Sequence, residues 1–206
     1  MKLYYAPGAC SLASHITLRE LGLPFELVRV DNRSKRTADG ADYLAINPKG
    51  YVAALQLDDG QVLTEGPAIL QYLADLRPEA RLAPAPGGLA RARLQEWLNF
   101  IGSEIHAGMN PLFDGELPEA LKTRFRNQVG KRLAQTAPAL EHSSHLLGEG
   151  FSVADAYLFT VLGWTQRLGI DLARWPALAR FVERVGARDS VRAALQAESQ
   201  QCTAPQ

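Results

Sequence analysis

The pattern of apolar residues changes once along this chain, at a stretch rich in proline and glycine near residues 78–88. Before this stretch, short apolar runs and helical segments follow one another in the order strand, helix, strand, loop, strand, strand, helix. After it, apolar residues recur at helical spacing to the end of the sequence. The sequence therefore predicts an α/β domain over residues 1–78, a linker over 79–88 and an all-helical domain over 89–206.

Local signals place several elements of the first part. Residues 2–6 have the pattern of a short buried strand, and the helix that follows is expected to end at Gly22. Residues 58–60, Asp-Asp-Gly, separate two strand-like runs and are typical of a β-hairpin. Pro67 stands at the expected first position of the next helix, where proline is best tolerated. The fold class that follows is α/β plus all-α, with a thioredoxin-like N-terminal domain followed by a helical C-terminal domain.

Charge and cysteine content exclude several classes of protein. The 206 residues include 22 Lys and Arg and 22 Asp and Glu, so the formal net charge is zero and we expect no nucleic acid or membrane partner. No apolar stretch approaches the length of a membrane span, and the first residues do not resemble a signal peptide. The two cysteines, Cys10 and Cys202, are too few for a disulfide framework, which favours a cytoplasmic location.

Cys10 lies where the first strand gives way to the first helix. The unpaired N–H groups and the positive end of the helix dipole favour a thiolate at such a position. Three residues further on the chain has Ala13, so dithiol exchange within a two-cysteine motif is not available. The residues alone leave four roles open for Cys10: a mixed disulfide, a nucleophile, a hydrogen-bond donor and simple packing.

Several motifs carry a resemblance to a known family. The stretches "PGACSLASHI", "NPKGYVAAL", "LTEGPAILQYLAD", "EWLNFIGSEIH" and "SVADAYLFTVLGW" resemble the glutathione S-transferases, specifically the bacterial beta class with a cysteine at the active site. The combination of Cys10 and His106 is specific to this class, and the resemblance implies that both are catalytic. It further implies a homodimer that joins the sulfur of glutathione, as co-substrate, to an electrophilic carbon of an apolar small molecule.

The resemblance also implies how the first domain would bind glutathione. Glu65 would accept the ammonium group of the γ-glutamyl head, and the backbone N–H of Gly66 would donate to the head carboxylate. Lys35 would pair with the glycyl carboxylate. The backbone of Val52 would pair with the cysteinyl unit in the manner of an added strand.

The helical domain is expected to contribute a polar face. Asn99, Ser103 and His106 recur at spacings of four and three residues, which places them on one side of a helix. The resemblance implies that residues 103–106, Glu104 among them, contact glutathione either within one subunit or from the partner subunit. Ala107 stands where the family often has a basic residue, so one charged contact of the family is expected to be missing.

Two other functions stay open at this point. One is a glutathione-dependent thiol reductase or dehalogenase that uses Cys10 through a mixed disulfide, and the other is a non-enzymatic carrier of apolar ligands. A metal site is not expected, because His142 and His145 have no cysteine or carboxylate cluster beside them in the sequence. His15 is expected to pack rather than to react.

Two expectations concern structure alone. Ser152 and Asp155 resemble a helix capping box, so Asp155 is expected to be structural rather than catalytic. Where the resembled family has a Val-Pro bond in the cis form, this chain has Val52 followed by Ala53. For a residue other than proline the cis form is unfavourable by about 3–4 kcal/mol, so we expect a trans bond here.

Overall fold

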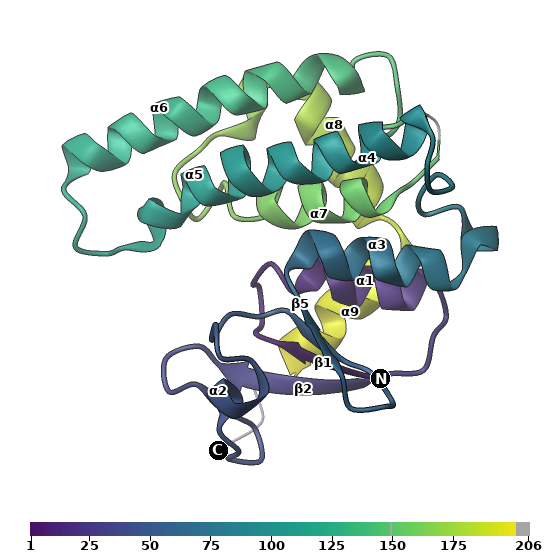
Figure 1. Cartoon of the computed structure of the whole chain (residues 1–206). Coiled ribbons are helices and arrows are strands. Elements are labelled where there is room, and N and C mark those ends of the chain that lie inside the picture. Colours follow the sequence, from purple (N-terminus) through teal and green to yellow (C-terminus); the bar gives the residue numbers. More distant parts are fainter. Residues whose placement is uncertain (149, 201–206) are drawn as a thin grey trace. The chain divides into compact units, whose positions relative to one another are not determined.

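The computed structural model describes residues 1–148 and 150–200, which divide into two units (Figure 1). The first unit comprises Met1–Ala80 together with the segment that begins at Ala187. The second unit comprises Arg81–Gly186. The first unit is therefore discontinuous in sequence, whereas the second is a single stretch of chain.

A five-stranded sheet forms the centre of the first unit. In the spatial order of the sheet, the strands are β3 (Arg36–Thr37), β2 (Glu26–Asp31), β1 (Lys2–Tyr5), β4 (Ala54–Gln56) and β5 (Val62–Thr64). β1 and β2 are parallel, and the neighbouring pairs β1–β4, β4–β5 and β2–β3 are antiparallel. This arrangement and the helices below confirm the predicted fold class.

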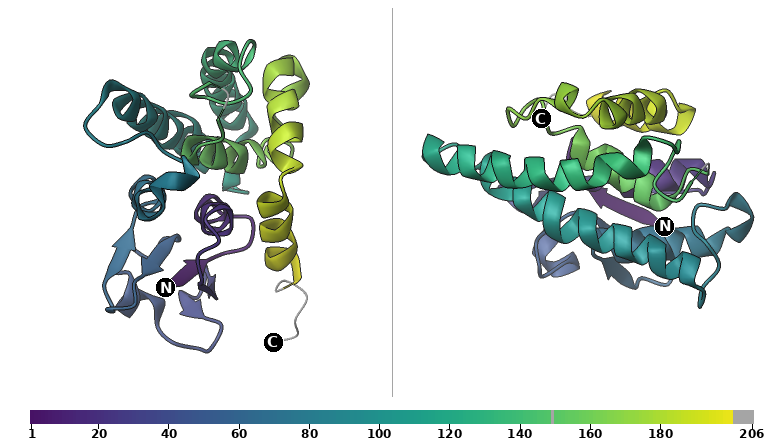
Figure 2. Two further views of the ribbon diagram at one scale, coloured as in Figure 1. Left: turned by 90° about the vertical axis from the view of Figure 1, so that its right-hand side faces the viewer. Right: turned by 90° about the horizontal axis from the view of Figure 1, so that it is seen from above.

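Four helices accompany this sheet: α1 (Leu12–Glu20), α2 (Tyr43–Ile46), α3 (Gly66–Leu76) and α9 (Asp189–Gln200). α1 packs against α3 and, on another side, along α9 (Figure 2). As a result, every residue from 12 to 18 is buried, polar ones included. The helix that follows Cys10 is thus enclosed by its neighbours, which bears on the chemistry of that cysteine.

The segment between β2 and β4 is more ordered than the sequence indicated. A loop was expected over 31–40, but Arg36 and Thr37 form the edge strand β3, and α2 follows at Tyr43. The side chain of Asp42 caps α2 by accepting the backbone N–H of Leu44 at 3.0 Å. Both elements are too short to have a recognisable apolar period, which is why the pattern did not reveal them.

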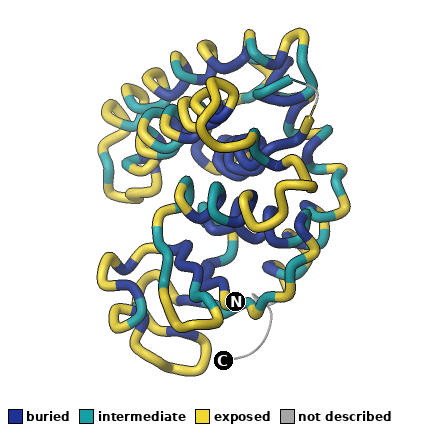
Figure 3. The backbone as a smooth tube through the Cα atoms, turned by 45° about the vertical axis from the view of Figure 1, so that its right-hand side comes forward, coloured by how far each residue is buried: buried dark blue, intermediate teal, exposed yellow. Residues whose placement is uncertain are grey.

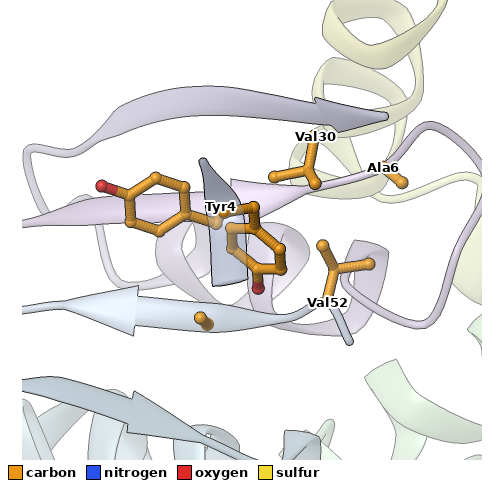
Figure 4. Close-up of a cluster of buried hydrophobic side chains, with 6 residues drawn as sticks. Tyr4, Ala6, Val30 and Val52 are labelled. Carbon is orange, nitrogen blue, oxygen red and sulfur yellow. The ribbon is translucent and has the colours of Figure 1, made fainter. Parts of the chain in front are cut away.

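A cluster of buried side chains joins α2 to three strands of the sheet. In Figure 4, Tyr4 of β1, Val30 of β2 and Val52 just before β4 approach one another. The ring of Tyr43 joins this cluster, with its centroid 5.7 Å from that of Tyr4. The short helix α2 is therefore anchored to the sheet by an aromatic contact.

The second unit is helical. Its longest helices are α4 (Leu89–Phe100), α6 (Glu119–Thr136), α7 (Val153–Leu162) and α8 (Pro176–Gly186), and single 3₁₀ turns occur at Asn110–Phe113, Ala137–Leu140 and Leu172–Arg174. All residues of α7 are buried, and the helix packs against α4 and α8 (Figure 3). Among the described residues, no helix combines the length and the apolarity needed to cross a membrane.

Two helical boundaries and the assignment of one helix to a unit differ from the sequence-based expectation. The apolar spacing over 89–110 predicts one helix, but the structure has a π-helical turn, Ile101–His106, between α4 and α5 (Ala107–Met109). Gly169 is the expected end of the helix that begins after Ser152, but α7 ends at Leu162 with Gly163 as its C-cap, and the chain continues as turns. α9 groups with the first unit because it packs on α1, whereas the predicted boundaries assigned it to the helical domain.

The capping box at the start of α7 is confirmed. One carboxylate oxygen of Asp155 accepts the backbone N–H and the hydroxyl of Ser152, at 2.8 and 2.6 Å. The other accepts the backbone N–H of Leu146 at 2.8 Å. Burial raises the pKa of Asp155, and the hydrogen bonds from Ser152 and Leu146 oppose this rise. Asp155 thus ties the preceding loop to the first turn of the most buried helix.

Candidate active site

Cys10 lies immediately before the N-cap of α1, Ser11, and its side chain is partly exposed. Its Sγ donates a hydrogen bond to the backbone carbonyl of Val52 at 3.1 Å. Burial raises the pKa of Cys10 to about 11, although the nearby backbone N–H groups oppose the rise. We expected the N-terminus of the helix to favour a thiolate. That expectation is wrong for this state, because desolvation of the thiol outweighs the backbone N–H groups at the helix N-terminus. Cys10 is a protonated donor.

The peptide bond between Val52 and Ala53 is cis, so the prediction of a trans bond is wrong. That prediction rested on the intrinsic preference of alanine. The structure has tertiary contacts on both sides of the bond: Val52 accepts from Cys10, and Ala54 pairs with Tyr4 in the sheet. Contacts of this kind are not visible in the local sequence.

Glu65 and Gly66 lie at the start of α3. Glu65 is the N-cap, with a φ of 70°, and its exposed side chain accepts from Lys49 Nζ at 2.7 Å. A positive φ is uncommon for a residue with a side chain and is often found at functional sites. Gly66 is the first residue of α3, so its N–H has no partner within the helix. This end of α3 offers a carboxylate and a backbone donor side by side.

Lys35 also has a positive φ, 56°. Its Nζ donates to the backbone carbonyl of Gly50 at 2.8 Å and lies 5.7 Å from the centre of the Tyr51 ring. Within the described residues, only Lys35, Glu65 and Arg81 combine a side chain with a positive φ. Two of these three are residues that the family resemblance assigned to glutathione.

Residues 47–52, which we call the 47–52 loop, connect the predicted site residues of the first unit. Cys10 bonds to Val52, Lys35 to Gly50 and Glu65 to Lys49. The sequence analysis missed Lys49, although it lies within a quoted motif. The signal could not have been read from spacing, because the lysine and its carboxylate are 16 residues apart on either side of a hairpin.

In the second unit, His106 ends the π-helical turn that follows α4. Its Nδ1 lies 2.8 Å from the hydroxyl oxygen of Tyr157, and its ring centroid is 4.9 Å from that of Trp164. Burial lowers the pKa of His106, so the imidazole is neutral at pH 7. Turns of π type are frequent at functional sites, and this one orients a histidine that the family resemblance singled out.

The other predicted residues of this helix are more exposed. Ser103 donates to the backbone carbonyl of Asn99 at 2.9 Å, one turn earlier. The carboxylate of Glu104 pairs with Arg132 Nε of α6 at 2.6 Å. Asn99 and Ser103 thus lie together on the surface of the second unit, and Glu104 is directed toward α6.

Aromatic rings continue from His106 across the surface of the second unit. The ring of Phe113, which is 39% exposed, lies 5.5 Å from the ring of Trp164. The guanidinium of Arg167 lies 5.4 Å from the centre of the Phe113 ring. The sequence analysis did not single out these residues, because single aromatic residues far apart in sequence give no pattern.

His15 and Cys202 lie outside the groups described above. His15 is fully buried, accepts from Arg19 Nε at 2.8 Å and donates from Nδ1 to Glu198 at 3.0 Å, which confirms the expected packing role. In the described part of the chain, no three side chains of His, Cys, Asp or Glu gather as metal ligands. Cys202 lies outside the described residues.

Two family models match the chain, one in each half. The model described as "Glutathione S-transferase, N-terminal domain" matches residues 8–76. The model described as "Glutathione S-transferase, C-terminal domain" matches residues 96–189. Together they span Cys10, the 47–52 loop and the π-helical turn.

Known proteins resemble the whole chain. Glutathione S-transferase GstA of Escherichia coli O157:H7 is 49% identical over 198 residues, which cover 96% of this chain and 98% of that protein. The structure described as a ternary complex of BphK, a bacterial GST, has a TM-score of 0.95 at 57% identity and covers 97% of this chain and 100% of that one. A beta class enzyme of Sphingomonas chungbukensis has a TM-score of 0.93 at 46% identity, covering 96% and 98%.

Proposed function

We infer the chemistry of this chain from one premise: it belongs to the glutathione S-transferase family, as its motifs predicted. It is accordingly a transferase that conjugates glutathione to electrophilic small molecules. The two rival functions, a thiol reductase or dehalogenase and a non-enzymatic carrier, are not favoured, since the similar proteins are named as transferases. The protonated state of Cys10 also argues against its use as a nucleophile.

The hydrogen bond from Cys10 to Val52 carries the proposed position of the glutathione sulfur. If the cysteinyl unit pairs with the backbone of Val52, its N–H takes the place of the Cys10 thiol at the Val52 carbonyl. The thiol of Cys10 is then released beside the glutathione sulfur. We assign the glycyl carboxylate to Lys35 and the γ-glutamyl ammonium to Glu65, where it replaces the ammonium of Lys49. The backbone N–H of Gly66 receives the head carboxylate.

In this arrangement Cys10 acts through its proton. Glutathione loses its thiol proton to solvent, and the S–H of Cys10 donates a hydrogen bond to the resulting thiolate. The thiolate attacks the electrophilic carbon, a carbon–sulfur bond forms, and the leaving group departs with the bonding electrons. Because burial raises the pKa of Cys10 to about 11 in the free protein, Cys10 enters the reaction protonated at pH 7.

The family resemblance supports the assignment of His106, Asn99, Ser103 and Glu104 to the same activity. For the electrophile we propose the aromatic surface formed by His106, Trp164 and Phe113, since flat rings offer stacking area. We propose a homodimer, which the family resemblance supports, and a cytoplasmic location, which the low cysteine content supports.

Calorimetric titration with reduced glutathione, followed by an assay with an activated aryl chloride, tests this function. We expect one glutathione bound per chain, a thioether product in the mass spectrum and one chloride released per conjugate. In Cys10→Ala, conjugation should survive in part, whereas reduction through a mixed disulfide would stop. Binding of glutathione without conjugation of any electrophile in a panel would overturn the assignment as a transferase.

A further inference from the structure

The backbone carbonyls of the 47–52 loop accept hydrogen bonds from side chains that the proposed function assigns to glutathione and from side chains that are buried. The carbonyl of Val52 accepts from Cys10 at 3.1 Å, and that of Gly50 accepts from Lys35 at 2.8 Å. The carbonyl of Tyr51, between them, accepts from the hydroxyl of Tyr43 at 2.8 Å and from Nδ2 of Asn47 at 2.7 Å. A carbonyl oxygen has two lone pairs, so these two hydrogen bonds use the full accepting capacity of the Tyr51 carbonyl.

The two sets of donors are expected to respond differently when glutathione binds. Under the proposed function, Cys10 and Lys35 turn to the ligand and so release the carbonyls that they hold in the free protein. Tyr43 and Asn47 have relative exposures of 0% and 2%, which keeps them from contact with a ligand. Their hydrogen bonds to Tyr51 are therefore the ones that can persist when glutathione is bound.

Asn47 is itself held on several sides. Its Oδ1 accepts the backbone N–H of Lys49 at 3.1 Å, so one side chain joins two points of the loop. Its backbone N–H donates to Tyr43 at 2.8 Å, and its carbonyl accepts from Gly50 at 2.9 Å. Tyr43 in turn contacts the ring of Tyr4, whose strand lies at the centre of the sheet. The Tyr51 carbonyl is thus fixed to buried residues of the core.

We propose that Tyr43 and Asn47 are positioning residues for glutathione, which fix the Tyr51 carbonyl and thereby hold the adjoining backbone of Val52 in the orientation that pairs with the cysteinyl unit. This inference rests on the proposed function. Neither residue touches the ligand. They act by preparing the loop before glutathione arrives, so that binding does not have to order it.

The inference predicts a change in binding without a change in chemistry. Tyr43→Phe retains the ring in the core and removes only the donor to Tyr51. We expect the Kd and the KM for glutathione to rise about three- to tenfold, the range for one lost hydrogen bond. The kcat at saturating glutathione should stay within about twofold, since the ligand then orders the loop itself.

A matched control is available in the neighbouring ring. Tyr4→Phe removes a hydroxyl from the same aromatic pair, but that hydroxyl donates to Gln56 Oε1 at 3.0 Å and not to the loop. Its Kd for glutathione should equal that of the unaltered protein. Asn47→Ala removes contacts at both ends of the loop and should raise the Kd further. Combined with Tyr43→Phe it should raise the Kd by less than the product of the two effects, because both donors share one acceptor.

Amide hydrogen exchange in the absence of glutathione gives a second reading. Tyr43→Phe should speed exchange of the backbone N–H groups in the 47–52 loop, and Tyr4→Phe should not. An unchanged Kd in Tyr43→Phe, or an equal rise in both tyrosine variants, would overturn the inference. If the unaltered protein bound no glutathione, the proposed function would fall instead, and the exchange rates would still decide whether Tyr43 and Asn47 fix the loop.

Discussion

The two units hold their candidate residues by different means. In the first unit, the groups expected to meet glutathione include the backbone of Val52 and Gly66 beside three side chains, and buried side chains fix the loop that presents the Val52 backbone. In the second unit, the group of interest is the side chain of His106, and the rings of Tyr157 and Trp164 fix its orientation. From this difference we expect substitutions in the first unit to change the affinity for glutathione, and substitutions near His106 to change the turnover rate.

The largest effect is expected at Asp155, where the comparison predicts loss of stability without loss of affinity. Asp155→Ala leaves the buried N–H groups of Ser152 and Leu146 unpaired and removes a helix cap. The free energy of unfolding should fall by about 2–4 kcal/mol, measured by urea denaturation. The Kd of the folded fraction for glutathione should be little changed. Unaltered melting together with lost turnover would instead make Asp155 catalytic.

The next effect concerns the proton on Cys10. Its pKa of about 11 lies above the ordinary value of 9.0, so the thiolate fraction grows as the pH rises toward 11. At pH 7.5 the thiolate should be about 100-fold rarer than for an ordinary thiol, since each pKa unit is a factor of ten. Iodoacetamide alkylation of Cys202→Ser, followed by mass spectrometry from pH 7 to 11, measures this. A plateau in the alkylation rate below pH 8 would show a stabilised thiolate and remove the donor role.

Glu65→Gln tests whether the first unit binds glutathione by charge as well as by backbone. Loss of a charged acceptor for the ammonium should raise the Kd about 10- to 100-fold. The control is Glu26→Gln, which alters a similarly exposed ion pair of the same unit, Lys2 with Glu26 at 3.2 Å. Calorimetry should show no change for that variant. Equal effects of the two substitutions would point to general electrostatics rather than to a specific contact.

The smallest effect is expected at Tyr157 and tests the second half of the comparison. Tyr157→Phe keeps the ring that packs on His106 and removes the hydroxyl 2.8 Å from its Nδ1. We expect the kcat of conjugation to fall about three- to tenfold, as for one lost hydrogen bond, with the Kd for glutathione unchanged. Tyr72→Phe, on α3 of the other unit, serves as the control. A raised Kd with unaltered kcat would show that His106 acts in binding.

Much of the fold could be predicted from the sequence because its signals are local. Strand-length runs and helical spacing located most of the sheet and the long helices, and Pro67 and the 58–60 turn marked their ends. The π-helical turn gave no signal, since Ile101–His106 has the same residue types as an ordinary helix. The position of α9 in the first unit depends on its packing against α1, which no local pattern contains.

The residues of the candidate site were predicted from motifs, and what the prediction missed follows from that. Motifs contained Cys10, Glu65 and His106, and the resemblance they carry pointed to Lys35. They did not show the state of the thiol, because desolvation depends on the residues that enclose it. They also did not reveal Tyr43, whose hydroxyl acts on a carbonyl eight residues away. Contacts made by buried polar groups determine how the 47–52 loop is held, and the sequence shows only that such groups exist.

Because α9 belongs to the first unit but follows the second unit in sequence, the first unit cannot be completed until α9 has been synthesised. The turn that precedes Cys10 donates the N–H of Gly8 to Glu198 at 3.1 Å, and Glu198 also holds His15. A ribosome that makes about 5–20 residues per second releases the second unit, which is one unbroken stretch, several seconds after the first β-strands. Only when α9 emerges can Glu198 hold the turn before Cys10 and the buried ring of His15. The earlier part of this chain is thus completed last, and a nascent chain lacking α9 would hold the Cys10 thiol in an unfinished fold.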